Sequence, residues 1–233
     1  MNQAKLYQYE VCPFCLKVRV GLGVKKAPFE KIEVHPLNKK ELSFSDYKKV
    51  PVYMDSKGSQ VNDSNKILEH IDTEFNSGPK LFAENPAALE EQKKWLEWSE
   101  KYVKTIPPLI YDTFPNALKA FDYITKQGKF SWIQKKTVKY SGALVMKMVA
   151  KKSKEKYNIP NPPEAIKNYI NEWTKGLSGK AFQGGESPDV TDVAVYGITL
   201  STRDLPHSKL FLENKEFSSW LKRMGEQSGI HYA

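Results

Sequence analysis

Cysteine is scarce in this chain of 233 residues, which contains only Cys12 and Cys15. Because both belong to one short motif, no network of disulfides can hold the rest of the chain together. That distribution favours a reducing compartment and predicts a redox, catalytic or metal-binding role for the pair. The four histidines show no metal-ligand spacing with the cysteines, so we expect no metal site.

Long apolar runs are also missing. No window reaches the roughly 18 consecutive apolar residues that a membrane-spanning helix needs. Residues 1–4 show no basic region followed by an apolar run, which a secretory signal would have. We therefore expect a cytoplasmic protein, which is membrane-associated if an N-terminal anchor precedes this sequence. The length allows one or two domains with a sizeable core.

The positive charge is unevenly spread. Of the formal net charge of +9, a segment from Lys135 to Lys156 carries eight lysines and one acid, Glu155. Such a run is most often a solvated helix face, but it can also make peripheral contact with an anionic membrane. We expect no nucleic-acid partner, because the lysines do not alternate with arginines and aromatic residues.

The first 75 residues alternate strand and helix patterns. The periodicity predicts a strand over 5–9, a helix from Pro13 to about Lys25, a strand over 29–34, a hairpin over 51–61 and a helix over 64–75. This order is that of a thioredoxin-like domain, which we assign to residues 1–76.

Helical patterns dominate the rest. Residues 77–88 read as a linker, and residues 89–233 as an all-helical C-terminal domain. We expect one helix from Asn85-Pro86 that is broken near Pro107-Pro108. The further predicted helices cover 110–125, 132–152, 163–177, 189–200 and 215–224. The predicted fold class is therefore α/β plus all-α, which is the plan of glutathione transferases.

The motif Cys12-Pro13-Phe14-Cys15 falls where the first strand meets the first helix. The first thiol of such a motif lies at the helix N-terminus, where unpaired amides and the helix dipole favour the thiolate. Cys15 falls one turn later and further inward, where it could resolve a mixed disulfide. A pair of buried structural cysteines is the alternative, and zinc would need two further ligands.

Val50-Pro51 precedes the third predicted strand. In a thioredoxin-like domain, a proline at this place is usually cis and faces the reactive thiol, and we expect that here. The N–H and C=O of Val50 would then pair with an extended peptide such as the cysteinyl unit of glutathione. The alternative is an ordinary proline at the start of a strand.

Asn62-Asp63-Ser64-Asn65 opens the last helix of the first domain. A helix N-terminus with the Ser64 hydroxyl suits a carboxylate, here that of the γ-glutamyl unit of glutathione. Asp63 could pair with the ammonium group of the same unit. Plain helix capping is the alternative.

Four segments together resemble a known family, the glutathione-transferase-like prostaglandin E synthases of type 2. They are residues 6–19, 47–51, 61–64 and 139–143, followed by the basic run to Lys156. The resemblance covers nearly the whole chain. The N-terminal motifs alone would also fit two-domain glutaredoxins.

The resemblance implies that the protein binds glutathione, and haem together with it, and forms a homodimer. It also implies isomerisation of the prostaglandin endoperoxide H2 to prostaglandin E2. With haem bound, it implies breakdown to malondialdehyde and hydroxy-heptadecatrienoic acid. Cys12 would be the catalytic thiol, with Tyr9 and Phe14 lining the pocket. Val50, Asp63 and Ser64 would hold glutathione.

Three hypotheses follow. The first is the glutathione-dependent isomerase acting on a lipid peroxide, with Cys12 as the reactive thiol. The second is a glutaredoxin-like dithiol oxidoreductase that uses Cys12 and Cys15 on disulfide substrates. The third is a haem or glutathione carrier, or a membrane-surface adaptor, without catalysis.

Overall fold

The computed structural model describes residues 3–36, 38–127 and 132–233. The chain divides into two compact units. Unit 1 comprises Met1–Leu96, Gly179–Ser201 and Trp220–Ala233, and unit 2 comprises Glu97–Ser178 and Thr202–Ser219. The predicted domain boundary at residues 77–88 stays a prediction beside this division.

Unit 1 contains one four-stranded sheet in the order β2-β1-β3-β4. The strands are β1 (Ala4–Gln8), β2 (Phe29–Glu33), β3 (Val52–Met54) and β4 (Gln60–Asn62). β1 pairs with β2 in parallel and with β3 in antiparallel fashion, and β3 and β4 form the hairpin. The predicted thioredoxin-like order is confirmed.

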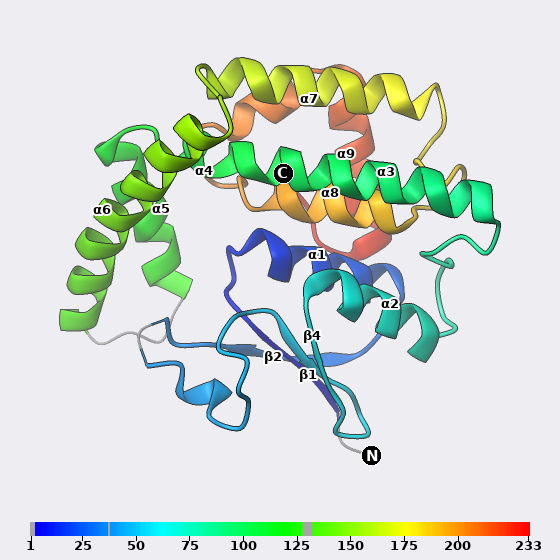
Figure 1. Cartoon of the computed structure of the whole chain (residues 1–233), viewed down its shortest axis with the longest axis horizontal. Helices are drawn as coiled ribbons and strands as arrows, with labels where there is room; N and C mark the ends of the chain where they lie inside the picture. Colours follow the sequence, from blue (N-terminus) through cyan, green and yellow to red (C-terminus); the bar gives the residue numbers. More distant parts are fainter. Residues whose placement is uncertain (1–2, 37, 128–131) are drawn as a thin grey trace. The chain divides into compact units, whose positions relative to one another are not determined.

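Three helices build on this sheet. α1 (Pro13–Val24) and α2 (Ser64–Glu74) lie side by side above it in Figure 1, and α8 (Val190–Leu200) packs on α1. Gly197 allows that approach, because a Cβ there would clash with the backbone of Lys17. With neighbours on both sides, α1 is buried at nearly every position. The start of α1, which carries the cysteines, is therefore held on a rigid element.

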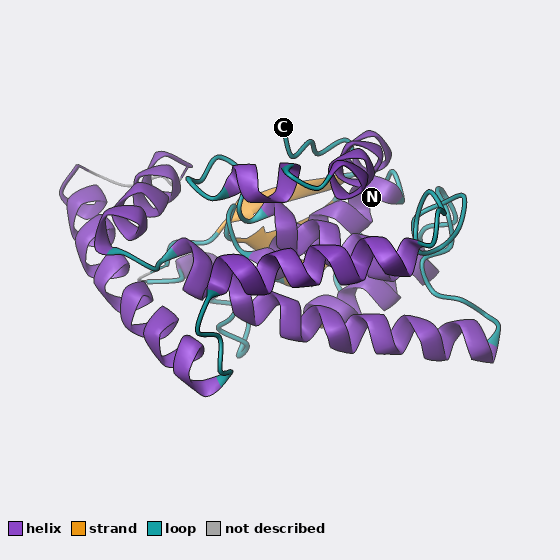
Figure 2. Ribbon diagram, turned by 90° about the horizontal axis from the view of Figure 1, so that it is seen from above, coloured by secondary structure: helices purple, strands orange, loops and turns teal. Residues whose placement is uncertain are grey.

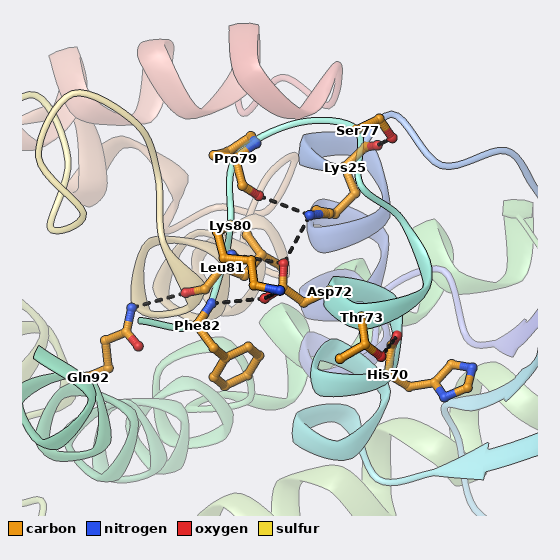
Figure 3. Close-up of polar contacts among 10 residues, drawn as sticks. All are labelled: Lys25, His70, Asp72, Thr73, Ser77, Pro79, Lys80, Leu81, Phe82 and Gln92. Atoms are coloured by element: carbon orange, nitrogen blue, oxygen red, sulfur yellow. Dashed lines mark hydrogen bonds and ion pairs between the residues drawn. The ribbon is translucent and has the colours of Figure 1, made fainter. Parts of the chain in front are cut away.

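The segment after α2 is anchored by a buried ion pair (Figure 3). Lys25 Nζ lies 3.0 Å from Asp72 Oδ1, and both side chains are almost fully buried. Lys25 also donates to the Pro79 carbonyl, and Asp72 accepts from the Leu81 and Phe82 amides. This network fixes residues 79–82, within the predicted linker, to α1 and α2.

Helices form most of the described part of unit 2, and the first and last of them also include residues of unit 1 (Figure 2). They are α3 (Pro86–Tyr102), η2 (Val103–Thr105), α4 (Ile106–Ile110), α5 (Phe114–Gln127), α6 (Trp132–Lys156), α7 (Pro162–Leu177), η3 (Ser208–Leu212) and α9 (Lys215–Ser228). α5 and α6 pack side by side around Ala117, Phe121, Val138 and Ala143. The fold class predicted from the sequence, a thioredoxin-like part with a helical part, is confirmed.

Some predicted helix boundaries were wrong. The first long helix ends at Tyr102. α4 begins at Ile106, so Pro107 and Pro108 lie in its first turn instead of breaking a helix, since proline suits a first turn. The helix predicted from residue 110 begins at Phe114, because Thr113 accepts from the Asn116 amide just before it. α6 runs four residues past the predicted end at 152, and α9 four past 224.

Among the described residues, no helix has the length and apolar character needed to cross a membrane.

Candidate active site around Cys12

Cys12 is the N-cap residue of α1, and Pro13 is the first residue of the helix. Cys12 is partly exposed, whereas Cys15, one turn along, is fully buried. The two thiols thus occupy the predicted positions, one open at the helix start and one facing inward. The Cys12 amide donates to the Tyr9 carbonyl at 3.1 Å, which closes the turn between β1 and α1.

The surroundings move the pKa values of the two thiols in opposite directions. The pKa of Cys12 is lowered, first because the Cys15 thiol donates a hydrogen bond to it, and then by the backbone amides of Cys15 and Phe14. Burial and the negative charge of Glu33 oppose this shift. The pKa of Cys15 is raised well above its ordinary value by burial and by its bond to Cys12. Cys12 is therefore the thiolate of the pair, and Cys15 the donor.

Tyrosines lie near the thiols. Tyr9 and Tyr47 pack, with Val50, against an apolar cluster centred on Val34, Leu42 and Val52. Burial raises the pKa of Tyr9, and the charge of the two cysteines raises it further. The pKa of Tyr47 is raised by burial, and then by Asp63 and the cysteines. Both phenols stay protonated and can donate hydrogen bonds.

The Val50–Pro51 peptide bond is cis, as expected from the sequence. Pro51 is buried at the entry to β3, and Val50 is half-buried. Among the described residues, none forms a hydrogen bond with the backbone N–H or C=O of Val50.

Asp63 caps α2. One of its carboxylate oxygens accepts from the amides of Asn65 and Lys66. Its backbone has φ 72° and ψ 129°, a conformation that L-residues rarely adopt and that carries about 1–3 kcal/mol of strain. Ser64, the first residue of α2, is nearly buried. Helix capping therefore accounts for the contacts of the Asp63 side chain. It does not account for the strained backbone of Asp63, and strain of this kind is concentrated at functional sites.

A carboxylate pair, missed in the sequence, braces the turn that leads to Cys12. Glu10 forms an ion pair with Arg19 at 2.7 Å, and its amide donates to Glu33 at 2.9 Å. Burial raises the pKa of Glu33. Glu33 lies on β2, which the sequence predicted from the alternation of charged and apolar residues over 29–34. That alternation did not predict that Glu33 lies near the thiols.

The sequence of this chain is similar to those of known proteins. Residues 6–80 match the family model described as the glutathione S-transferase N-terminal domain. The chain is 30% identical over 261 residues to prostaglandin E synthase 2 of Danio rerio, covering 94% of this chain and 69% of the relative. The chain belongs to the prostaglandin E synthase 2 family.

Solved structures agree with the fold of this prostaglandin E synthase 2 relative. Glutathione S-transferase III in its apo form superposes with a TM-score of 0.64 at 15% identity, covering 98% of this chain and 94% of that one. Glutaredoxin 2 of Salmonella typhimurium in complex with glutathione gives a TM-score of 0.59 at 18% identity, covering 100% and 97%.

The fold gathers some of the predicted residues. The two thiols share a hydrogen bond, and burial and their charges raise the pKa of Tyr9. The pKa of Tyr47 is raised by burial and by the charges of Asp63 and Cys12. Phe14 contributes its amide to Cys12, and its side chain is half-buried. The roles of Tyr9, Phe14, Val50, Pro51, Asp63 and Ser64 in catalysis and binding stay predictions.

Proposed function

We propose that this protein is a glutathione-dependent isomerase of the prostaglandin E synthase type, with Cys12 as its reactive thiol. The observation that carries the proposal is the lowered pKa of Cys12 at the start of α1, in a chain of the prostaglandin E synthase 2 family. Glutathione is the expected cofactor, because glutathione-transferase folds of this kind, including the glutaredoxin 2 complex, bind it.

Glutathione would lie across the groups described above. The free N–H and C=O of Val50 suit the backbone of its cysteinyl unit. The Ser64 hydroxyl and the amides at the start of α2 suit its γ-glutamyl carboxylate, and the second Asp63 oxygen suits its ammonium group. This arrangement would bring the glutathione sulfur toward Cys12.

The chemistry needs no outside oxidant. The thiolate attacks one endoperoxide oxygen, the O–O bond breaks, and the second oxygen takes a proton to become the hydroxyl of prostaglandin E2. Loss of the proton from the carbon bearing the sulfur-bound oxygen forms the ketone and releases the thiolate. The Tyr9 phenol, whose pKa is raised, would supply the first proton.

Product analysis tests this proposal. Purified protein is given prostaglandin H2 with glutathione, and prostaglandin E2 is measured against spontaneous breakdown. We expect turnover in the native chain and a loss of about 10²-fold or more in Cys12→Ser, as for removal of a catalytic nucleophile. Equal turnover in Cys12→Ser would refute the role of Cys12.

A second function is favoured by one observation, the Cys15 thiol hydrogen-bonded to Cys12. A pair of this kind is what a glutaredoxin-like dithiol oxidoreductase uses, with Cys15 resolving the mixed disulfide. Reduction of a glutathionylated peptide is the assay. Activity that falls strongly in Cys15→Ser supports this function, and no activity in the native chain removes it.

Haem is the second cofactor that the family implies. The donor chemistry fits, because Cys12 offers a thiolate and thiolate is an established axial ligand of haem. Bound haem, held through Cys12 or the glutathione sulfur, would supply the breakdown of the endoperoxide to malondialdehyde and hydroxy-heptadecatrienoic acid. A thiolate-type visible spectrum that needs glutathione supports this proposal. If haem causes no spectral change, the proposal is contradicted, and the haem-carrier hypothesis is left without support.

Peripheral membrane contact is proposed for α6. Beside its lysines, this helix exposes a group of apolar side chains: Tyr140, Leu144, Val145, Met148 and Val149. An exposed apolar stripe with flanking lysines is typical of helices that lie in an anionic membrane surface. Sedimentation with phosphatidylserine vesicles tests it, and binding should weaken in 0.5 M salt and in Leu144→Glu. Binding that neither change affects would contradict it.

A homodimer is the expected assembly. Light scattering of the native chain should give a mass near twice 26.7 kDa, and a monomeric mass at micromolar concentration would contradict it.

A further inference from the structure

Three side chains of unit 1 that could hold a metal ion come together at the β3–β4 hairpin and α2. Asp55 follows β3 in the hairpin, and His70 and Glu74 are one turn apart on α2. His70 Nε2 lies 3.2 Å from Asp55 Oδ2 and 3.6 Å from Glu74 Oε2. One ligand atom from each residue lies within 4.8 Å of the others.

One imidazole nitrogen of this cluster, His70 Nε2, is buried. It has no hydrogen-bond partner among the residues that the structure describes, although an Asp55 oxygen is within hydrogen-bond distance. The approach of that oxygen is therefore too bent for a hydrogen bond. A buried ring nitrogen that lies close to two carboxylate oxygens without a hydrogen bond to either fits a metal ion shared by the three groups.

The two carboxylates are held in place by other groups. Asp55 Oδ1 accepts from the amides of Lys57 and Ser59 at 2.9 Å and 2.7 Å, which leaves Oδ2 to face His70. The buried Tyr53 donates its hydroxyl proton to Glu74 Oε2 at 3.0 Å. Such outer contacts orient the ligands of metal sites and limit their rotation.

We propose that Asp55, His70 and Glu74 bind a zinc ion, with water as the fourth ligand. Ligands about 2.0–2.1 Å from zinc at tetrahedral angles lie about 3.3–3.4 Å apart, close to the two separations from His70. One imidazole with two carboxylates is a donor set that zinc accepts. The His70 side chain is 30% exposed, so water has access.

The site has a structural consequence. The ion would join the β3–β4 hairpin to α2, which begins at Ser64 and is capped by Asp63. Binding to the folded state alone would stabilise it by mass action. The site is separate from the chemistry proposed for Cys12, and its test uses no substrate of that chemistry.

Zinc titration tests the proposal. The probe is Zn²⁺ added to the full chain carrying Cys12→Ser and Cys15→Ser, so that thiols do not compete, followed by calorimetry. We expect one zinc per chain, and at least a tenfold loss of affinity in His70→Asn and in Glu74→Gln. His207→Asn is the matched control, because His207 also lies beside a carboxylate, Asp112, at 3.8 Å. It should bind zinc as its parent does.

A second measurement separates a metal site from a simple ion pair between His70 and the carboxylates. Zinc should raise the melting temperature of the parent and leave that of His70→Asn unchanged. Co²⁺ in place of zinc should give the intense visible bands of tetrahedral coordination. The proposal is overturned if zinc does not bind the parent, or if it binds His70→Asn equally well, each variant having first been shown to fold by circular dichroism.

Discussion

At the scale of single residues, the two thiols of one motif are made unequal by their surroundings. Cys12 receives hydrogen bonds from a thiol and two amides, whereas Cys15 is buried and supplies one of those bonds. The thiolate is therefore favoured on the partly exposed Cys12 over the buried Cys15.

Removing the Cys15 donor should raise the pKa of Cys12. In Cys15→Ala the thiolate loses its strongest hydrogen bond, so the protonated form persists to higher pH. The rate of alkylation of Cys12 by iodoacetamide, measured from pH 5 to 10, should show its midpoint at higher pH than in the native chain. An unchanged midpoint would mean that the amides alone stabilise the thiolate.

Glu33 should act in the opposite direction. Its negative charge raises the pKa of Cys12, so Glu33→Gln is expected to lower the alkylation midpoint. Exposed Glu30, on the same strand, is the control, and Glu30→Gln should leave the midpoint unchanged. A midpoint that rises in Glu33→Gln would contradict the placement of this charge.

The sequence alone predicted the places of some of these residues in the site, but not of others. The motif spacing predicted the open Cys12, the inward Cys15 and the cis bond before Pro51, because each depends on local chain geometry. Tyr47 and Glu33 act on the thiols from distant positions of the chain, so spacing could not identify them. Likewise, Asp55 joins His70 only through the folded hairpin, although the spacing of His70 and Glu74 was a weak signal.

At the scale of elements, the buried pair of Lys25 and Asp72 joins the end of α1, the end of α2 and the segment that follows (Figure 3). Asp72→Ala should lower the free energy of unfolding by about 3–5 kcal/mol, because it leaves a buried ammonium group without its counter-charge and two amides without their acceptor. Urea unfolding followed by circular dichroism measures this loss.

Two variants control that experiment. Glu69→Ala, at an exposed position of the same helix, should change the free energy of unfolding by less than about 0.5 kcal/mol. Replacing both partners, as Lys25→Met with Asp72→Leu, should lose less than Asp72→Ala alone, since no charge is left buried. A loss for Asp72→Ala as small as that for Glu69→Ala would contradict the assigned role.

Element types followed from the sequence more reliably than element ends. Alternation and helical spacing predicted the strands and the helices around Cys12, because those patterns come from burial on one face. The start of α5 depends on the local cap at Thr113, and the near-complete burial of α1 depends on α8, far along the chain. Neither effect leaves a pattern in the segment itself.

At the scale of the whole molecule, family membership and the local chemistry at Cys12 support one account. The family likeness covers nearly the full chain. The groups proposed to hold glutathione are the Cys12 thiolate, the start of α2 and the Val50 backbone, which has no hydrogen-bond partner among the described residues. The central claim is therefore that glutathione binds between Cys12 and Ser64. Both the isomerase and the oxidoreductase depend on it.

Calorimetric titration of the reduced protein with glutathione tests that claim most directly. We expect binding by the native chain, at least a tenfold weaker affinity in Ser64→Ala, since a hydrogen bond to a charged group contributes about 1.5–3 kcal/mol, and native affinity in Thr73→Ala on the same helix. If Ser64→Ala binds glutathione as tightly as the native chain and Thr73→Ala do, glutathione does not use the start of α2, and the account is wrong at its centre.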